Sequence, residues 1–326
     1  MDMERIANLD QLAALRQSVV QGPNGKSWRA IDVSVYGGLT LRVLPDRGFD
    51  ISHASWQGIP LVWIGPTGEG PALSVLNGQD WEAAFSGGLL ATCGLANVGE
   101  ASEGHAQHGR INHMPAQDIV FDRTVVDGKI EVQLSATVIE RTLDDGLFRM
   151  ERCYRFLSGS PAMAVVDTVT NLSTSRKPAP LLYHINLGWP LVDGQTRIEV
   201  AGRQQTLTEF GDQGNLPGGW SQPGKLSKPG KPSVTMEHVL DPALVEGQVR
   251  ILSPGAGVAM TIRWDRKSLP RLFQWVNFQP GIGVLAIEPS NACTLGREFD
   301  RQQGRLAFLN AGESRTTMLQ ISLERL

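Results

Sequence analysis

The sequence predicts an all-β protein, folded as a large antiparallel β-sandwich with a short N-terminal helix. Glycine and proline are abundant, with 36 and 19 copies in 326 residues, and such a surplus is typical of tight turns between short strands. Apolar and polar residues alternate with a period of two over most of the chain, which indicates half-buried strands. Hydrophobic residues make up 41% of the chain, enough to fill a core and to exclude disorder over most of its length.

The helix is expected near the N-terminus. Asn8 can cap it, and Gln11 follows three positions later, as in a capping box. Its apolar stripe would be formed by Leu9, Leu12 and Ala13. We therefore expect residues 1–25 to form a helical extension and residues 26–326 to form a single β-sandwich catalytic domain.

The strand pattern begins after Lys26. Segments that alternate with a period of two are 31–36, 39–44, 148–156, 258–264 and 319–323. The clearest hairpin joins Ile119–Val126 to Lys129–Ile139 through Asp127-Gly128, a dipeptide suited to a type I′ turn. One face of its second strand carries Ile130, Val132, Leu134, Ala136 and Val138. The alternation with polar residues predicts one buried and one solvated sheet face.

Charge and hydropathy restrict the partners. The chain has 30 basic and 33 acidic residues and a formal net charge of -3, so we expect neither nucleic acid nor a membrane as a partner. No run approaches the roughly 18 apolar residues of a membrane span. The polar start MDMERIANLDQLAALRQ lacks the apolar core of a signal peptide. We expect a cytoplasmic protein, and an exposed edge strand would leave pairing into a homodimer open.

Polar residues interrupt the strand pattern at three places. These are QHGRINH (107–113), LLYHINL (181–187) and VLAIEP (284–289). Burying a carboxylate without a partner is costly, so Glu288 in the third segment should be paired or should face a cavity. A His and a Glu on one concave sheet face can act as general acid and general base. Each residue alone also fits a structural role, but together with nearby Arg and Asn they suit a neutral polyol such as a sugar.

In order and local context, these segments resemble the galactose mutarotase-like (aldose 1-epimerase) superfamily, in a branch of epimerase-like proteins. The resemblance rests on LPDRGFDI (44–51), GGLLATCGLANVG (87–99), QHGRINHMPA (107–116), LLYHINLGWPL (181–191) and IEPSNA (287–292). It implies the mutarotase-like form of the β-sandwich, the supersandwich. It also implies an isomerase of carbohydrate metabolism that acts on a free sugar or sugar derivative.

The resemblance implies a catalytic pair. Glu288 takes the place of the general base, which removes the proton from the anomeric O1 hydroxyl. His184 takes the place of the general acid, which protonates the ring oxygen. The hemiacetal then opens, the C1–C2 bond rotates, and reclosure yields the other anomer. This reaction needs no metal, no cofactor and no covalent intermediate, so we expect none.

The resemblance also implies substrate-binding residues. His108 takes the place of a sugar-binding histidine, and Arg110 or Arg47 takes that of an arginine that contacts sugar hydroxyls. We add His113 and Asn186, which lie in the same segments, to the expected substrate-binding set. Because a guanidinium can pair with a carboxylate or a sulfonate, the two arginines leave a sugar with an acidic substituent open.

Two other functions stay open. The histidines of 105–113 follow the spacing H-x2-H-x4-H, which fits no dedicated zinc pattern but would allow a metal-dependent sugar isomerase or epimerase. A non-catalytic carbohydrate-binding protein is the second alternative, because tryptophans such as Trp81 and Trp220 could stack on a sugar ring. Acceleration of anomer exchange separates catalysis from binding.

Overall fold

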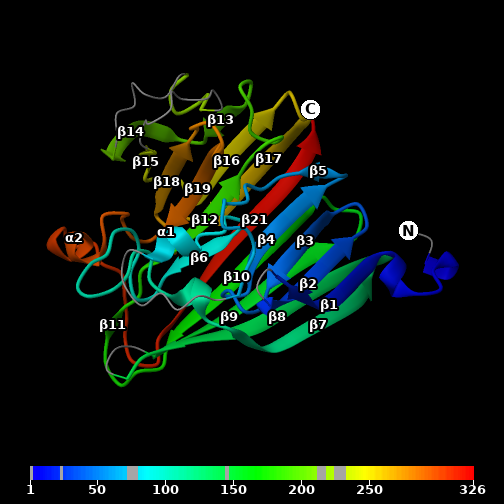
Figure 1. Ribbon diagram of the computed structural model, residues 1–326, viewed down its shortest axis with the longest axis horizontal. Coiled ribbons are helices and arrows are strands. Elements are labelled where there is room, and N and C mark those ends of the chain that lie inside the picture. The colour runs from blue at the N-terminus through cyan, green and yellow to red at the C-terminus, as the bar shows by residue number, and fades with distance from the viewer. Residues whose placement is uncertain (1–2, 23–24, 72–79, 144–146, 211–217, 224–232) are drawn as a thin grey trace.

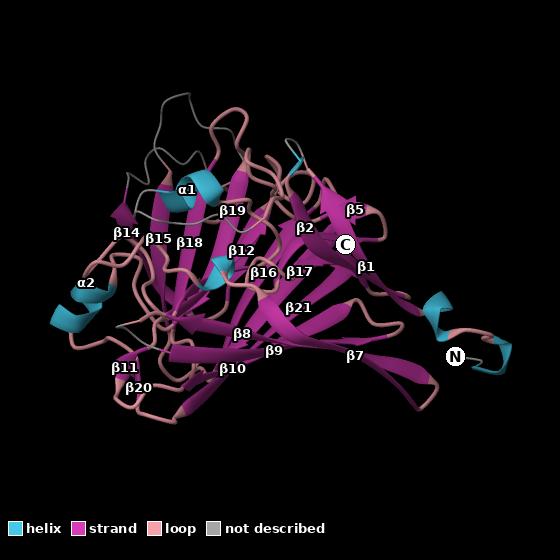
Figure 2. Cartoon of the chain, turned by 60° about the horizontal axis from the view of Figure 1, so that its bottom comes forward, coloured by secondary structure: helices cyan, strands magenta, loops and turns pink. Residues whose placement is uncertain are grey.

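Strands dominate the computed structural model, which describes all residues except 1–2, 23–24, 72–79, 144–146, 211–217 and 224–232 (Figure 1). They form antiparallel sheets of five, eight, six and two strands, and the helices are few and short (Figure 2). The predicted all-β class is confirmed. No helix among the described residues is long and apolar enough to cross a membrane.

Three large sheets contain most of the strands. In spatial order, the eight-stranded sheet consists of β13 (Arg197–Val200), β16 (Glu246–Ser253), β17 (Val258–Asp265), β21 (Ser314–Arg325), β10 (Ala162–Asn171), β9 (Leu147–Leu157), β8 (Lys129–Arg141) and β7 (Ala116–Val126). The six-stranded sheet consists of β14 (Arg203–Phe210), β15 (Val234–Leu240), β18 (Arg271–Asn277), β19 (Val284–Ser290), β12 (Leu181–Leu187) and β6 (Ala91–Gly94). The five-stranded sheet consists of β1 (Ala13–Gln21), β2 (Ser27–Val35), β3 (Leu39–Leu44), β4 (Asp50–Trp56) and β5 (Ile59–Pro60).

The remaining elements are small. They are the pair β11 (Lys177–Pro178) and β20 (Phe308–Leu309), the helices α1 (Asp80–Ala84) and α2 (Arg297–Gln302), and 3₁₀ helices at Met3–Arg5, Leu9–Gln11 and Ile111–His113.

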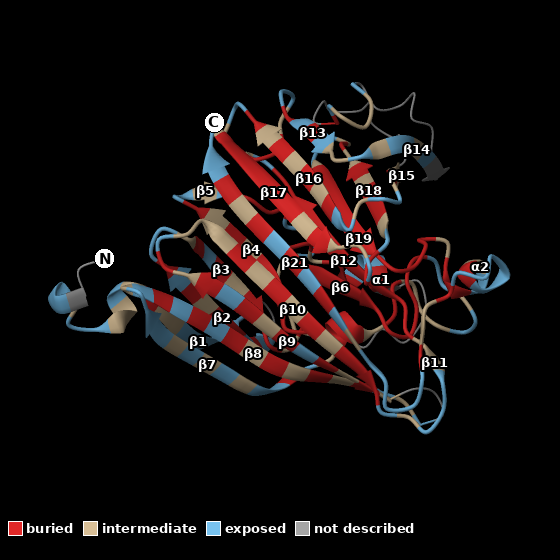
Figure 3. Cartoon of the chain, turned by 180° about the vertical axis from the view of Figure 1, so that it is seen from behind, coloured by how far each residue is buried: buried red, intermediate tan, exposed pale blue. Residues whose placement is uncertain are grey.

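The predicted hairpin is confirmed. β7 and β8 pair antiparallel up to Val126 opposite Lys129. Asp127 and Gly128 have φ values of 49° and 69°, the left-handed conformations that a type I′ turn requires at both central positions. Figure 3 shows buried and exposed residues alternating along the strands of the eight-stranded sheet. The apolar residues predicted for one face of β8 are all at most 4% exposed, so that face forms part of the core.

The short N-terminal helix is not confirmed. The capping box of Asn8 and Gln11 is present, but it closes only the 3₁₀ helix Leu9–Gln11. The chain then extends as β1 and pairs along its whole length with β2. Local capping signals can start a helical turn, whereas pairing with a neighbouring strand decides the conformation of the residues that follow.

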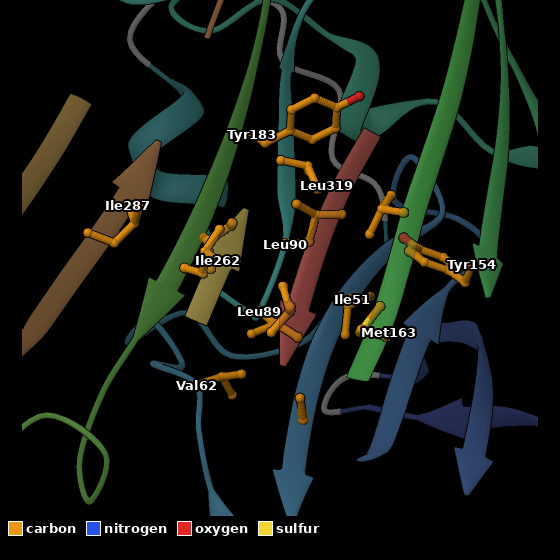
Figure 4. Close-up of a cluster of buried hydrophobic side chains, with 14 of the residues drawn as sticks. Ile51, Val62, Leu89, Leu90, Tyr154, Met163, Tyr183, Ile262, Ile287 and Leu319 are labelled. Carbon is orange, nitrogen blue, oxygen red and sulfur yellow. The ribbon is translucent and has the colours of Figure 1, made fainter. Parts of the chain in front are cut away.

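The core lies between the sheets. Figure 4 shows apolar side chains from the three large sheets meeting there, among them Ile51 of β4, Tyr154 of β9, Ile262 of β17, Tyr183 of β12 and Ile287 of β19. Each of these five is at most 1% exposed. The six-stranded sheet therefore turns one face toward this core, and its other face carries the residues of the candidate site.

Candidate active site

His184 and Glu288 are cross-strand neighbours in the six-stranded sheet. β12 pairs antiparallel with β19, with Ile185 opposite Ile287, and this register places His184 opposite Glu288. Opposite residues of an antiparallel pair project from the same face of the sheet. Nε2 of His184 lies 3.2 Å from Oε1 of Glu288, and both side chains are buried. Strand pairing thus brings together two residues that are far apart in the sequence.

The core holds this register in place. Tyr183, Ile185 and Ile287 belong to the hydrophobic core cluster, and Tyr183 and Ile287 are drawn in Figure 4. Because successive side chains of a strand point to opposite faces, a slip of one residue would move these apolar groups out of the core. The buried face of β12 and β19 therefore keeps His184 and Glu288 on the same side.

Aromatic rings surround the imidazole of His184. Its ring centroid lies 5.0 Å from that of Phe85, 5.7 Å from that of Trp275 and 6.0 Å from that of His108. Burial among these rings lowers the pKa of His184 to about 3, and the neighbouring His108 contributes in the same direction. The imidazole is therefore neutral near pH 7.

His108 reaches the site from the loop that follows the glycine-rich run. Its ring centroid lies 4.4 Å from that of Trp81, and its backbone has a left-handed φ of 56°. The N–H of Gly99 donates to Nδ1 of His108 over 3.3 Å. Burial lowers the pKa of His108 to about 4. A neutral ring that accepts at Nδ1 carries its proton on Nε2.

Gly99 is required at its position. Its φ is 76°, and a Cβ atom there would lie 1.9 Å from the carbonyl oxygen of Thr294. Only glycine allows this close backbone approach. The contact lets the loop lie against the segment after β19, so that Gly99 can donate to His108.

A cavity of about 520 Å³ opens beside the pair, within the range of roughly 300–1,000 Å³ for small-molecule sites. His184, Glu288 and His108 all line it. Its other lining residues are Trp63, Pro66, Thr67, Trp81, Glu82, Phe85, Gly99, Glu100, Gln107, Ser233, Thr235, Trp275, Asn277, Ile282 and Thr294. Aromatic rings beside hydroxyl, amide and carboxylate groups can hold the apolar face and the hydroxyl groups of a sugar.

Arg47 and His113 lie outside the lining of this cavity. Arg47 is buried, and it donates from Nη2 to Ala84 O (3.0 Å) and from Nε to Asn112 O (3.2 Å). It therefore ties the end of α1 to the 3₁₀ helix that contains His113. His113 is also buried, and its ring nitrogens have no hydrogen-bond partner among the described residues. Burial, followed by the charge of Arg47, lowers its pKa to about 3.

Asn186 and Arg110 are not brought to the cavity either. Asn186 is fully buried on β12 and donates from Nδ2 to Gly88 O over 3.0 Å. Arg110 lies in a separate, smaller pocket, where its Nη2 is 3.6 Å from Oε1 of Glu140. His108 and Gly109 both adopt left-handed φ angles, so the chain turns between His108 and Arg110, and the two side chains reach different pockets.

Glu82, Phe85 and Glu100 are among the cavity-lining residues that sequence reasoning missed. Glu82 and Phe85 lie in or just after the short helix α1, a segment without strand periodicity. Glu100 follows the glycine-rich run directly, and this position was the one available signal. Trp220, predicted as a stacking residue, packs instead beside His238 and Arg203.

The described residues contain no group of three or more His, Cys, Asp or Glu side chains arranged to hold a metal ion. His108 lines the cavity, while His113 lies behind it in the 3₁₀ helix. Within the described part of the chain, these histidines do not converge on one point.

Comparison with known proteins gives a family and a fold. The family model described as "Domain of unknown function (DUF4432)" matches residues 25–323. A search of curated protein sequences finds no match. Among solved structures, a "putative aldose 1-epimerase" from Klebsiella pneumoniae superposes with a TM-score of 0.84 at 21% identity, covering 97% of this chain and 86% of that chain.

Two further solved structures have the same architecture. A galactose mutarotase-like protein from Clostridium acetobutylicum superposes with a TM-score of 0.62 at 14% identity, covering 97% of this chain and 100% of that one. A "putative aldose 1-epimerase" from Escherichia coli has a TM-score of 0.62 at 16% identity, covering 96% and 100%. At these identities the likeness shows a common fold, and the predicted resemblance to the mutarotase-like proteins is confirmed at that level.

Proposed function

The chain belongs to the family described as Domain of unknown function (DUF4432), and because that description names no activity, we propose one from the site: epimerisation of a free sugar at its anomeric carbon. The observation that carries the proposal is the pair His184–Glu288, with 3.2 Å between Nε2 and Oε1, on the wall of a cavity of about 520 Å³. The reaction needs one acid and one base within reach of two neighbouring sugar oxygens, and such a pair supplies both.

In this proposal the two side chains share one proton. During ring opening Glu288 takes the proton of O1, and the imidazolium of His184 protonates the ring oxygen. During ring closure the imidazole takes that proton back, and the carboxylic acid of Glu288 protonates O1. Each positioned acid or base contributes typically about 10²–10⁴-fold to the rate, which is ample for a reaction that also proceeds unaided in water.

The electrostatics of the site bear on the acid of this pair. Burial lowers the pKa of His184 to about 3, so the imidazole is neutral near pH 7. Ring opening in this proposal therefore requires His184 to take up a proton before it protonates the ring oxygen.

The test is anomer exchange, measured by NMR on a panel of neutral aldoses and ketoses. We expect the wild-type protein to accelerate exchange of at least one sugar, and Glu288→Gln and His184→Ala each to lower kcat by about 10²-fold or more. Circular dichroism should show both variants folded. Glu237→Gln is the matched control, because Glu237 lies on β15 of the same sheet but pairs with Arg271 over 2.7 Å. Full activity in either pair variant would refute the assignment.

Binding without catalysis is the second candidate. The aromatic rings of Trp63, Trp81 and Trp275 along the cavity favour it, because such rings bind sugars whether or not a reaction follows. The same NMR samples separate the two functions. A sugar that binds while its anomers exchange at the uncatalysed rate would favour the binding protein.

A further inference from the structure

The loop of residues 65–69 forms part of the cavity wall. Pro66 and Thr67 are exposed, and both line the cavity. The side chain of Glu69, two positions later, is only 10% exposed. Burying a carboxylate is costly unless it has partners, so the partners of Glu69 show where this loop is attached.

Four donors from the five-stranded sheet contact the carboxylate of Glu69. Ser52 Oγ donates to Oε1 over 2.5 Å, and Nδ1 of His53 lies 2.6 Å from the same oxygen. Nη1 of Arg42 and Nε1 of Trp28 each donate to Oε2 over 3.4 Å. Burial alone would raise the pKa of Glu69, but hydrogen bonds from His53 and Ser52 lower it to about 2. The carboxylate is therefore ionised near pH 7 and binds β2, β3 and β4 together.

Ser52, His53 and Glu69 do not form a nucleophilic triad. In a Ser–His–acid triad, the serine hydroxyl and the acid occupy different nitrogens of the imidazole. Here both face Nδ1 of His53, because Ser52 Oγ lies 3.1 Å from that nitrogen. An ionised carboxylate only accepts hydrogen bonds, so Nδ1 carries a proton and cannot take one from Ser52. The cluster therefore anchors the loop and does not activate a nucleophile.

The other side of the loop is bound to the segment that carries Phe85. Thr67 Oγ1 donates to Phe85 O over 3.0 Å, and the N–H of Gly65 donates to Ser86 O over 2.9 Å. The ring of Phe85 lies 5.0 Å from that of His184. The loop thus connects the five-stranded sheet to the cavity wall beside His184.

We propose that Glu69 is a positioning residue for sugar binding: it anchors the loop to the five-stranded sheet and thereby fixes the cavity wall that Pro66 and Thr67 form. The inference rests on the proposed function and deepens it, because Glu69 itself lies outside the lining and acts through the loop. His184 and Glu288 stand on β12 and β19 of a different sheet. Release of the loop should therefore weaken sugar binding and leave the acid–base step intact.

The kinetics of anomer exchange separate this role from a merely structural one. In Glu69→Ala we expect KM for the best sugar of the panel to rise about tenfold and kcat to stay within about twofold of wild type, because the wall contributes to binding and not to proton transfer. Glu69→Gln keeps one accepting oxygen in the same space and should fall between Glu69→Ala and the wild type. Circular dichroism should show both variants folded.

Asp32→Ala is the matched control, with the same change of net charge. Asp32 pairs with Arg42 over 2.7 Å, the same arginine that contacts Glu69, but it stands on β2 and not on the loop. It should leave KM and kcat unchanged. An unchanged KM in Glu69→Ala, a loss confined to kcat, or an equal rise of KM in Asp32→Ala would overturn the proposal.

Hydrogen exchange tests the anchor independently of the proposed function. The amides of Gly65 and Gly68 donate to Ser86 O and Gly65 O, each over 2.9 Å, and local opening of the loop exposes them to solvent. In Glu69→Ala, exchange measured by mass spectrometry on a peptide spanning 65–69 should be at least about tenfold faster. Peptides from β12 should exchange as in the wild type. Unchanged exchange in the loop would refute the anchor even in an active enzyme.

Failure of the proposed function gives a different result. If no sugar of the panel exchanges faster than in buffer, the epimerase assignment fails, and sugar binding measured by saturation-transfer difference NMR takes the place of KM. Weaker binding in Glu69→Ala than in Asp32→Ala would then support the positioning role. Equal binding in the two variants would contradict it.

Discussion

At the residue scale, His108 offers the cavity one defined hydrogen-bonding group. Its Nδ1 accepts from the N–H of Gly99, and burial lowers its pKa to about 4. The ring therefore stays neutral near pH 7 and keeps its proton on Nε2. We expect this Nε2–H to donate to a hydroxyl oxygen of the bound sugar, which would fix the sugar relative to His184.

Two amide substitutions test this donor. In His108→Gln the amide N–H can take the place of Nε2–H, whereas in His108→Asn the amide reaches only the place of Nδ1. We expect kcat/KM for anomer exchange to be about tenfold higher in the Gln variant than in the Asn variant. The Asn variant loses the hydrogen bond to the substrate, and such a loss costs about 1–2 kcal/mol. Asparagine suits the left-handed backbone of this position better. A more active Asn variant would therefore show that backbone conformation, not the donor, matters.

At the scale of elements, a buried ionic network behind the site joins strands of all three large sheets. Arg152 of β9 donates to Asp50 of β4 (2.6 Å) and to Thr92 of β6 (2.7 Å). It also makes a bidentate contact with Asp167 of β10 (2.8 and 2.6 Å). Tyr183 of β12, the residue before His184, donates to Asp167 over 2.6 Å. The network therefore supports the strand that carries the imidazole of His184.

Removing Arg152 should destabilise the protein strongly. Arg152→Met leaves Asp50 and Asp167 buried without their cation, which costs about 3–5 kcal/mol in the free energy of unfolding. Arg149→Met on the same strand is the matched control, because Arg149 pairs with an exposed Glu151, and we expect a loss below about 1 kcal/mol. Urea unfolding measures both. Equal losses of unfolding free energy in the two variants would mean that the buried network contributes no more to stability than a surface ion pair.

Local signals and long-range pairing account for what could be predicted at this scale. The β7–β8 hairpin was predictable because Asp127-Gly128 encodes its turn within the hairpin itself. The prediction of an N-terminal helix was not confirmed for the opposite reason: β1 is formed by pairing with β2, and the capping signal of Asn8 does not contain that contact. Likewise, the pairing of β12 with β19 depends on the whole sheet and on no local motif.

The same distinction holds within the candidate site. His184, Glu288 and His108 stand in segments with recognisable order and context, and all three line the cavity. Glu82 and Glu100 lie on a short helix and a loop, where no period marks the exposed face. Their place at the cavity depends on how these segments pack, which a single sequence does not reveal.

At the scale of the whole molecule, four histidines are buried in neutral form. Burial lowers the pKa of His108 and His238 to about 4 and that of His113 and His184 to about 3. In the unfolded chain each histidine titrates near 6.5. Between about pH 4 and 6.5 the unfolded state therefore binds more protons than the folded state, and stability must fall as the pH falls. Asp50, whose pKa is raised by burial, opposes this by at most one proton.

We therefore predict that the urea midpoint falls steadily from pH 7 to pH 5. Each buried histidine contributes up to about 1.4 kcal/mol per pH unit to the slope of the unfolding free energy. His238→Gln removes one such group outside the candidate site, where His238 contacts Thr206 and Gln274. Its free energy of unfolding should therefore depend on pH less steeply, by about one proton. A midpoint independent of pH, or the same slope in His238→Gln, would mean that these imidazoles take up protons in the folded protein.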